Sequence, residues 1–129
     1  MTNNKILVIE DNELNMKLVR DLLKIGEYQV FEAGDAETGI ELAKVHNPDL
    51  ILMDIQLPGI NGLDATKILK EKAEFNSIPI IALTGCAMRG DKKKALDAGC
   101  VGYITKPIDT RAFLKKIAQF FNGHSKNSE

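Results

Sequence analysis

Five side chains that can take part in chemistry follow apolar runs of the sequence. They are the carboxylates of Glu10, Asp11 and Asp54, the hydroxyl of Thr84 and the amine of Lys106. Carboxylates gathered in one crevice repel one another, and proteins accept this cost where a cation offsets it or where a raised pKa is needed. Oxygen ligands without a nearby His or Cys favour Mg²⁺ over zinc or copper. Together with a hydroxyl and an ammonium group, such acids form a phosphoryl-binding site.

The elements that must position these groups alternate between two kinds of apolar pattern. Short continuous apolar runs predict buried strands, and apolar residues spaced three or four positions apart predict helices. The strands are expected at residues 5–9, 29–33, 50–54, 78–83 and 101–105, and the helices at residues 12–26, 35–47, 63–71, 87–98 and 109–121. This alternation predicts an α/β domain, with one five-stranded parallel sheet covered by helices on both faces.

Polar residues at the expected helix starts, and the spacing of leucines, predict where the first helix begins and which face it buries. The helix caps are expected at Asp11 or Asn12, then at Asp35, Asn61 and Asp109. The inward face of the first helix is expected to carry Leu14, Leu18 and Leu22, joined by Val19 and Leu23.

Length and composition predict one ordinary globular domain. The chain has 129 residues, 44% of them hydrophobic and 27% charged, with a formal net charge of −1. We expect a single domain over residues 1–122, a disordered polar tail over 123–129 and no output domain. The charge gives no reason to expect nucleic acid or a membrane as a partner, and no apolar run approaches the ~20 residues of a membrane span, so a cytoplasmic location is expected.

The order of the strands decides whether the acids meet. The common doubly wound order 2-1-3-4-5 has its switch point between strands 1 and 3, and it sets Glu10 and Asp11 beside Asp54 at the carboxyl ends of the strands. In this arrangement a carboxylate oxygen of Asp54 attacks phosphorus, while Mg²⁺, Lys106 and Thr84 stabilise the charge on the transferring oxygens. The expected product is an acyl phosphate on Asp54.

Several motifs resemble those of the receiver domains of two-component response regulators, which have the CheY-like, flavodoxin-like (βα)5 fold. They are the acids after the first strand, MD at 53 and 54, Thr84, Tyr103, and KP at 106 and 107. The segments VIEDNELNMKL and DLILMDIQLPGINGL are similar to single-domain regulators of the DivK type and to receivers of hybrid histidine kinases. The resemblance covers almost the whole chain.

The resemblance implies a role for each of these residues. Asp54 is the implied phosphoacceptor, and Mg²⁺ is implied to bind Asp11 and Asp54, with Glu10 assisting and the backbone carbonyl of Gln56 completing the protein ligands. Lys106 is implied to pair with the phosphoryl group, Thr84 to move toward it and Tyr103 to change rotamer. The peptide bond between Lys106 and Pro107 is implied to be cis.

Two residues depart from the family pattern. Glu10 stands where many members carry Asp, which lengthens the reach to the metal by one methylene and favours a water-mediated role. Gly85 replaces the commoner Ala after the switch Thr, and we expect it to loosen that loop. Gln56 and Cys86 lie two positions beyond Asp54 and Thr84, at positions that in this family influence how long the phosphoryl group survives.

The implied partners are a histidine kinase or a histidine phosphotransfer protein as the donor, and a downstream protein that binds the surface of the fourth helix, fifth strand and fifth helix. One alternative is a Mg²⁺-dependent phosphohydrolase with an aspartyl nucleophile. Such haloacid-dehalogenase enzymes carry D-x-D-x-T after their first strand, whereas Gln56 here takes the place of the general acid. A second alternative is a receiver-like binding module that is not phosphorylated.

Overall fold

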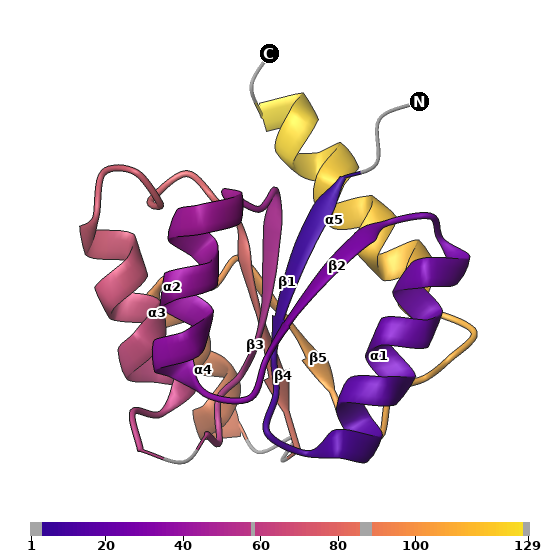
Figure 1. The fold of residues 1–129 in the computed structure, drawn as a ribbon, viewed down its shortest axis with the longest axis horizontal. Coiled ribbons are helices and arrows are strands. Elements are labelled where there is room, and N and C mark those ends of the chain that lie inside the picture. Colours follow the sequence, from indigo (N-terminus) through magenta and orange to yellow (C-terminus); the bar gives the residue numbers. More distant parts are fainter. Residues whose placement is uncertain (1–3, 58, 86–88, 128–129) are drawn as a thin grey trace.

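The computed structural model describes residues 4–57, 59–85 and 89–127, with the side chains of residues 89–92 and 122–127 left aside. Its centre is a five-stranded parallel sheet in the order β2-β1-β3-β4-β5 (Figure 1). The strands are β1 Lys5–Ile9, β2 Gln29–Ala33, β3 Leu50–Asp54, β4 Ile80–Thr84 and β5 Gly102–Thr105. The predicted fold class and strand order are confirmed.

The register of the strands brings the chemical residues to one edge of the sheet. Ile9 at the end of β1 pairs with Met53 in β3, so Glu10 and Asp54 follow directly on neighbouring strands. Asp54 itself pairs with Leu83, the residue before Thr84. The start of β1 and the described end of α5 lie at the opposite, amino end of the strands (Figure 1).

Five helices cover the sheet in two layers. They are α1 Glu13–Ile25, α2 Ala36–His46, α3 Gly62–Glu71, α4 Arg89–Ala98 and α5 Phe113–Asn127. Helices α1 and α5 lie on one face, and α2, α3 and α4 lie on the other (Figure 1). Because side chains alternate along a strand, Ile6 and Val8 of β1 join the core under α1 and α5, whereas Leu7 and Ile9 join the core under the other three helices.

The predicted caps at three helix starts are confirmed. The side chain of Asn12 accepts a hydrogen bond from the backbone N–H of Asn15, and Asp35 and Asn61 do the same for α2 and α3. Each cap satisfies one of the N–H groups that have no partner in the first turn of a helix. The caps at Asn12 and Asn61 therefore start α1 and α3 directly after the loops that follow Asp11 and Asp54.

The expected inward face of α1 is confirmed for Val19 and Leu23 and wrong for Leu14. Leu14 is 78% exposed, and the buried residues are Met16, Val19 and Leu23, with Leu22 packed against them. Positions 16, 19 and 23 follow the i, i+3, i+7 spacing of one face, whereas Leu14 lies on the opposite side of the helix. The leucine spacing thus placed Leu14 on the inward face and omitted Met16, which is buried there.

Several element ends differ from the expected ones. Strand β4 begins at Ile80, because the N–H of Ile78 turns back to the carbonyl of Phe75 and Pro79 has no N–H to donate. Asp109 accepts hydrogen bonds in a turn that precedes α5, rather than capping the helix itself. Of the other predicted features, Pro58, Cys86 and the start of the fourth helix at Ala87 lie outside the described residues.

The last helix also extends beyond its expected end. Backbone hydrogen bonds continue α5 to Asn127, over residues 123–127 where the polar composition predicted disorder. Polar composition indicates that the side chains add little to a core. It does not indicate whether backbone hydrogen bonds extend a helix that buried residues have already started. Phe113 and Ile117 of the same helix are buried.

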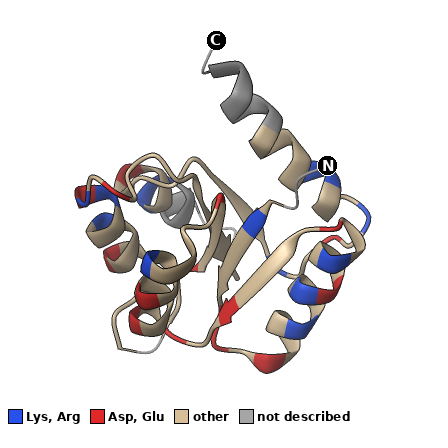
Figure 2. Cartoon of the chain, turned by 45° about the horizontal axis from the view of Figure 1, so that its top comes forward, with Lys and Arg blue, Asp and Glu red and all other residues tan. Residues whose placement is uncertain are grey.

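The surface charges are mixed in sign. Lys, Arg, Asp and Glu are interspersed along α1 and along the helices of the other layer (Figure 2). In the part of the chain that the structure describes, no helix is long and apolar enough to cross a membrane.

Candidate functional site

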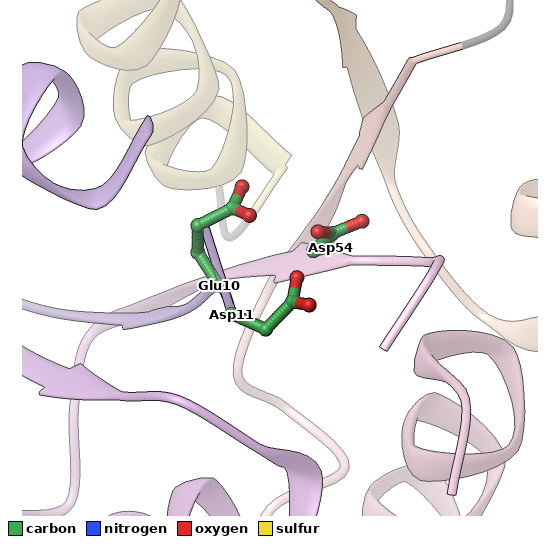
Figure 3. A group of neighbouring side chains, drawn as sticks. All are labelled: Glu10, Asp11 and Asp54. Carbon is green, nitrogen blue, oxygen red and sulfur yellow. The ribbon is translucent and has the colours of Figure 1, made fainter. Parts of the chain in front are cut away.

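Three carboxylates converge at the carboxyl ends of β1 and β3. Glu10 and Asp11 follow β1, Asp54 ends β3, and each offers an oxygen within 4.8 Å of the other two (Figure 3). Glu10 and Asp54 are buried, whereas Asp11 is exposed. The acid cluster that the strand order predicts is therefore present, and it opens to solvent on the side of Asp11.

Asp54 is held by the loop that follows it. The N–H of Gln56 donates to Asp54 Oδ1 at 2.9 Å, and the N–H of Gly62 donates to the carbonyl of Ile55 at 3.2 Å, which folds the loop back. A Cβ at position 62 would collide with the backbone carbonyl oxygen of Asp54. Glycine at 62 therefore allows α3 to start directly against the strand end.

Glu10 is fixed from two sides. Its N–H donates to the carbonyl of Ala33 in β2 at 2.9 Å, and its Oε2 accepts from the N–H of Asn12 at 3.1 Å. These contacts direct the side chain into the sheet edge, where it is 0% exposed. The carboxylate is buried in a place where a charge needs a partner.

Lys106, directly after β5, supplies that partner. Its N–H donates to the carbonyl of Thr84 at 2.8 Å, which fixes the backbone at the end of the sheet. Its Nζ lies 2.8 Å from Glu10 Oε1 and 3.2 Å from Asp54 Oδ2. One ammonium group therefore contacts two buried carboxylates from different strands.

The shared site shifts the protonation equilibria of both partners. Burial raises the pKa of Asp54 and the neighbouring Glu10 charge raises it further, and these effects outweigh the N–H of Gln56 and the charge of Lys106, which lower it. Burial lowers the pKa of Lys106, but Glu10 and Asp54 together raise it above its usual value. Lys106 is therefore charged at neutral pH.

The remaining predicted residues lie on β4 and β5. Thr84 is buried at the end of β4, one position past the residue that pairs with Asp54. Tyr103 is half-buried in β5 opposite Ala82, against the core under α2, α3 and α4. The Lys106–Pro107 peptide is cis. The motions of Thr84 and Tyr103 and the metal contact of the Gln56 carbonyl stay predictions.

The chain matches the family model of the response regulator receiver domain over residues 6–118. It belongs to that family. Among curated proteins, this receiver is 45% identical over 115 residues to the polar-differentiation response regulator DivK of Brucella ovis, a match that covers 89% of this chain and 94% of the relative. Receiver domains are signalling modules rather than typical enzymes.

Solved structures agree with this assignment. The receiver resembles the receiver domain of the sensor histidine kinase PA1611 from Pseudomonas aeruginosa, with a TM-score of 0.85 and 34% sequence identity. The match covers 95% of this chain and 99% of that one. The crystal structure of the PA1611 domain has a magnesium ion coordinated in its active-site cleft. The chemotaxis regulator CheY4 of Vibrio cholerae shares the fold at a TM-score of 0.86, 24% identity and coverage of 92% and 98%.

The donor set of the receiver fits Mg²⁺. Three carboxylates offer oxygens within 4.8 Å of one another, and oxygen is the ligand type that this small hard cation requires. A divalent cation would also offset the repulsion that burial imposes on Glu10 and Asp54. Asp11, being exposed, would hold the metal at the open side of the site together with Asp54.

Sequence reasoning missed two contributions to this site. It assigned Lys106 to the phosphoryl group alone and did not anticipate its contact with Glu10. That contact joins residues 96 positions apart in the sequence and depends on how far their two side chains reach across the sheet edge. It also gave Gly62 no part in positioning Asp54. The sequence does place Gly62 eight positions after Asp54, directly behind a capping Asn, and a tight return of the loop is the feature that such a glycine indicates.

Proposed function

We propose that Asp54 accepts a phosphoryl group from a phosphohistidine of a donor protein in a phosphorelay. A carboxylate oxygen of Asp54 forms the new bond to phosphorus while the bond between phosphorus and the imidazole nitrogen breaks, and the imidazole leaves with the electron pair. The observation that supports this proposal is the position of Lys106, whose Nζ lies 3.2 Å from Asp54 Oδ2 beside the two other acids.

The residues around Asp54 have separate roles in phosphoryl transfer. Asp11, Asp54 and the Gln56 carbonyl would hold Mg²⁺, which when bound would supply positive charge to the transferring oxygens. The Lys106 ammonium neutralises the same oxygens from the β5 side, and the Thr84 hydroxyl donates to one of them. The N–H of Gln56 holds Asp54 Oδ1 and so restricts the rotation of the carboxylate that must meet the phosphorus.

The donor protein docks beside the acids. A groove of about 670 Å³ opens next to Glu10 and Asp11, and Leu14 and Lys17 of α1 line it. The exposed Leu14 gives a partner an apolar contact at the rim of the acid site. A histidine kinase or a histidine phosphotransfer protein is the donor that this chemistry requires.

The surface of α4, β5 and α5 is the part of the receiver that signals to a downstream protein. Phosphorylation draws Thr84 toward the phosphoryl group, Tyr103 turns inward, and the surface of these elements changes for a downstream protein. The described part of this surface carries the exposed apolar residues Leu96 and Val101. Binding of DNA is not part of the proposal. A cytoplasmic location and a receiver over residues 1–122 stay predictions.

Acetyl phosphate with Mg²⁺ tests the phosphoacceptor. We expect intact-protein mass spectrometry to find one base-labile phosphoryl group on the wild type and none on Asp54→Asn. Asp64→Asn, which changes an exposed Asp of α3, is the matched control and keeps the adduct. Sustained hydrolysis of unrelated phosphate esters would favour a phosphohydrolase, and no adduct under any donor would leave a binding module.

A further inference from the structure

The buried carboxylate of Glu10 is compensated chiefly by Lys106. Glu10 Oε2 accepts from Asn12, but Oε1 has no hydrogen-bond partner among the residues that the structure describes. The Lys106 ammonium lies 2.8 Å from this oxygen as an ion pair, and its side chain is only 17% exposed. A buried charge in this situation is strongly tied to its counter-charge, because separating the two would leave both uncompensated.

The same ammonium also reaches Asp54, at a longer distance. Its Nζ is 3.2 Å from Asp54 Oδ2, against 2.8 Å from Glu10 Oε1. Asp54 is the group that must accept phosphorus, so it cannot hold the lysine tightly and react at the same time. Glu10 takes no part in the bond changes, and its contact with Lys106 can persist throughout them.

We propose that Glu10 is a positioning residue that holds the Lys106 ammonium beside Asp54, rather than a direct ligand of Mg²⁺. The extra methylene of Glu, compared with Asp, gives the carboxylate the reach to meet a lysine that directly follows β5. The metal is then left to Asp11 and Asp54, of which Asp11 is exposed. This inference rests on the proposed phosphoacceptor function and assigns one of its residues a different task.

The two possible roles of Glu10 predict different kinetics. A lost metal ligand weakens Mg²⁺ binding, and a higher Mg²⁺ concentration restores the rate. A lost contact to Lys106 leaves the ammonium misplaced at every Mg²⁺ concentration, so the rate stays low. Removing the negative charge of Glu10 also weakens Mg²⁺ binding, because some Coulomb attraction to the cation is lost. A variant that keeps the charge is therefore needed beside a neutral one.

The first experiment measures adduct formation from acetyl phosphate against Mg²⁺ concentration. At saturating Mg²⁺ we expect Glu10→Gln and Glu10→Asp to stay about tenfold or more below the wild type, whereas Asp11→Asn recovers as Mg²⁺ rises. We also expect Glu10→Asp, which keeps the charge, to bind Mg²⁺ with wild-type affinity. Recovery of both Glu10 variants at high Mg²⁺ would overturn the proposal.

A double-mutant cycle asks whether Glu10 acts through Lys106. If it does, the double variant Glu10→Gln with Lys106→Gln reacts no more slowly than Lys106→Gln alone. The reason is that Lys106→Gln has already broken the contact that Glu10→Gln would remove. Additive losses would mean that Glu10 acts independently of the lysine, and the positioning role would be wrong.

The second experiment needs neither Mg²⁺ nor phosphorylation. An ion pair inside a site slows exchange of the ammonium protons, so the Lys106 side-chain ¹⁵N signal should be visible in the metal-free wild type and lost or broadened in Glu10→Asp and Glu10→Gln. Asp11→Asn should leave it in place. An unchanged Lys106 signal in both Glu10 variants would contradict the proposal. Failure of the wild type to form any adduct would instead remove the proposed function, and the NMR result would still report the ion pair.

Discussion

The Lys106 ammonium lies 3.2 Å from Asp54 Oδ2, although the two residues are 52 positions apart in the chain. The contact exists because β4 lies between β3 and β5, so the ends of these strands open onto one edge of the sheet. Glu10, at the end of β1, closes the group from the other side. The sheet thereby concentrates negative charge around a single lysine, and the cost of that arrangement can be measured.

Asp54→Asn should stabilise the metal-free protein at neutral pH. The pKa of Asp54 is raised above its usual value of 3.8, first by burial and then by Glu10, so the folded state binds this proton more tightly than the unfolded state. The stability that Asp54 contributes is full below the usual pKa and is lost as the pH rises through the folded pKa. Asn is neutral at every pH, and we expect it to add about 1 kcal/mol at pH 7.

Chemical denaturation in a chelator checks this prediction. The difference between Asp54→Asn and the wild type should shrink as the pH falls to about 4, where the wild-type carboxyl becomes protonated. A variant that is less stable than the wild type at pH 7 would mean that the lysine outweighs burial.

Mg²⁺ should stabilise the folded wild type. A ligand that binds only the folded state adds about 2.7 kcal/mol when its concentration is a hundred times its Kd. The binding requires the exposed carboxylate of Asp11, so Asp11→Asn should lose most of the effect. Thermal or urea unfolding with and without Mg²⁺ measures it, with the same ionic strength of Na⁺ as the control. An equal stabilisation of both proteins would place the metal elsewhere.

Gly85→Ala should stabilise the protein although it lies next to Thr84. Among the residues that the structure describes, a Cβ at position 85 would meet only Gln56 Oε1 at 3.9 Å, an ordinary contact, and Gly85 is not one of the glycines with positive φ. Ala restricts the unfolded chain and should add about 0.4–1 kcal/mol to the free energy of unfolding.

Gly59→Ala is the matched comparison for Gly85→Ala. It also has open space around a Cβ, but its φ is +72°, which L residues adopt at a cost of about 1–2 kcal/mol. If urea denaturation shows that Gly85→Ala raises the free energy of unfolding and Gly59→Ala lowers it, backbone conformation decides the two effects. Destabilisation by both would show that the loop after Thr84 requires glycine.

The strand order and the convergence of the acids could be predicted because they follow from the alternation of elements. Each chemical residue ends an apolar run, and parallel strands bring such ends to one edge. The face of α1 could not be chosen in this way, because Leu14 and Met16 are both apolar and only packing against β1 and β3 selects the row of Met16. Element ends depended on local hydrogen bonds, such as the turn from Ile78 to Phe75.

The partner of Lys106 was also beyond sequence reasoning. Whether its ammonium meets Asp54 alone or Glu10 as well depends on side-chain length and on distances of 2.8 and 3.2 Å. A motif gives residue types at the strand ends, and it leaves open which of two acids each cation contacts. The departure from Asp to Glu at position 10 was visible, but its consequence required the geometry.

Gly62→Ala should impair both folding and phosphorylation, because the added methyl group would collide with backbone rather than with a movable side chain. Its nearest neighbours are the Asp54 carbonyl oxygen and the Ile55 Cα, the latter at 2.6 Å. Relief requires a shift of α3 or of the end of β3, and overpacking of this kind costs about 1–3 kcal/mol.

The same shift would move the Asp54 carboxylate relative to Lys106, so adduct formation from acetyl phosphate should fall by about tenfold or more even in the fraction that is folded. Gly34→Ala is the control, because a Cβ there has no atom within 4 Å. Circular dichroism establishes how much of each variant is folded, and mass spectrometry then gives the rate. A folded Gly62→Ala that is phosphorylated at the wild-type rate would mean that the close approach of α3 does not position the acceptor.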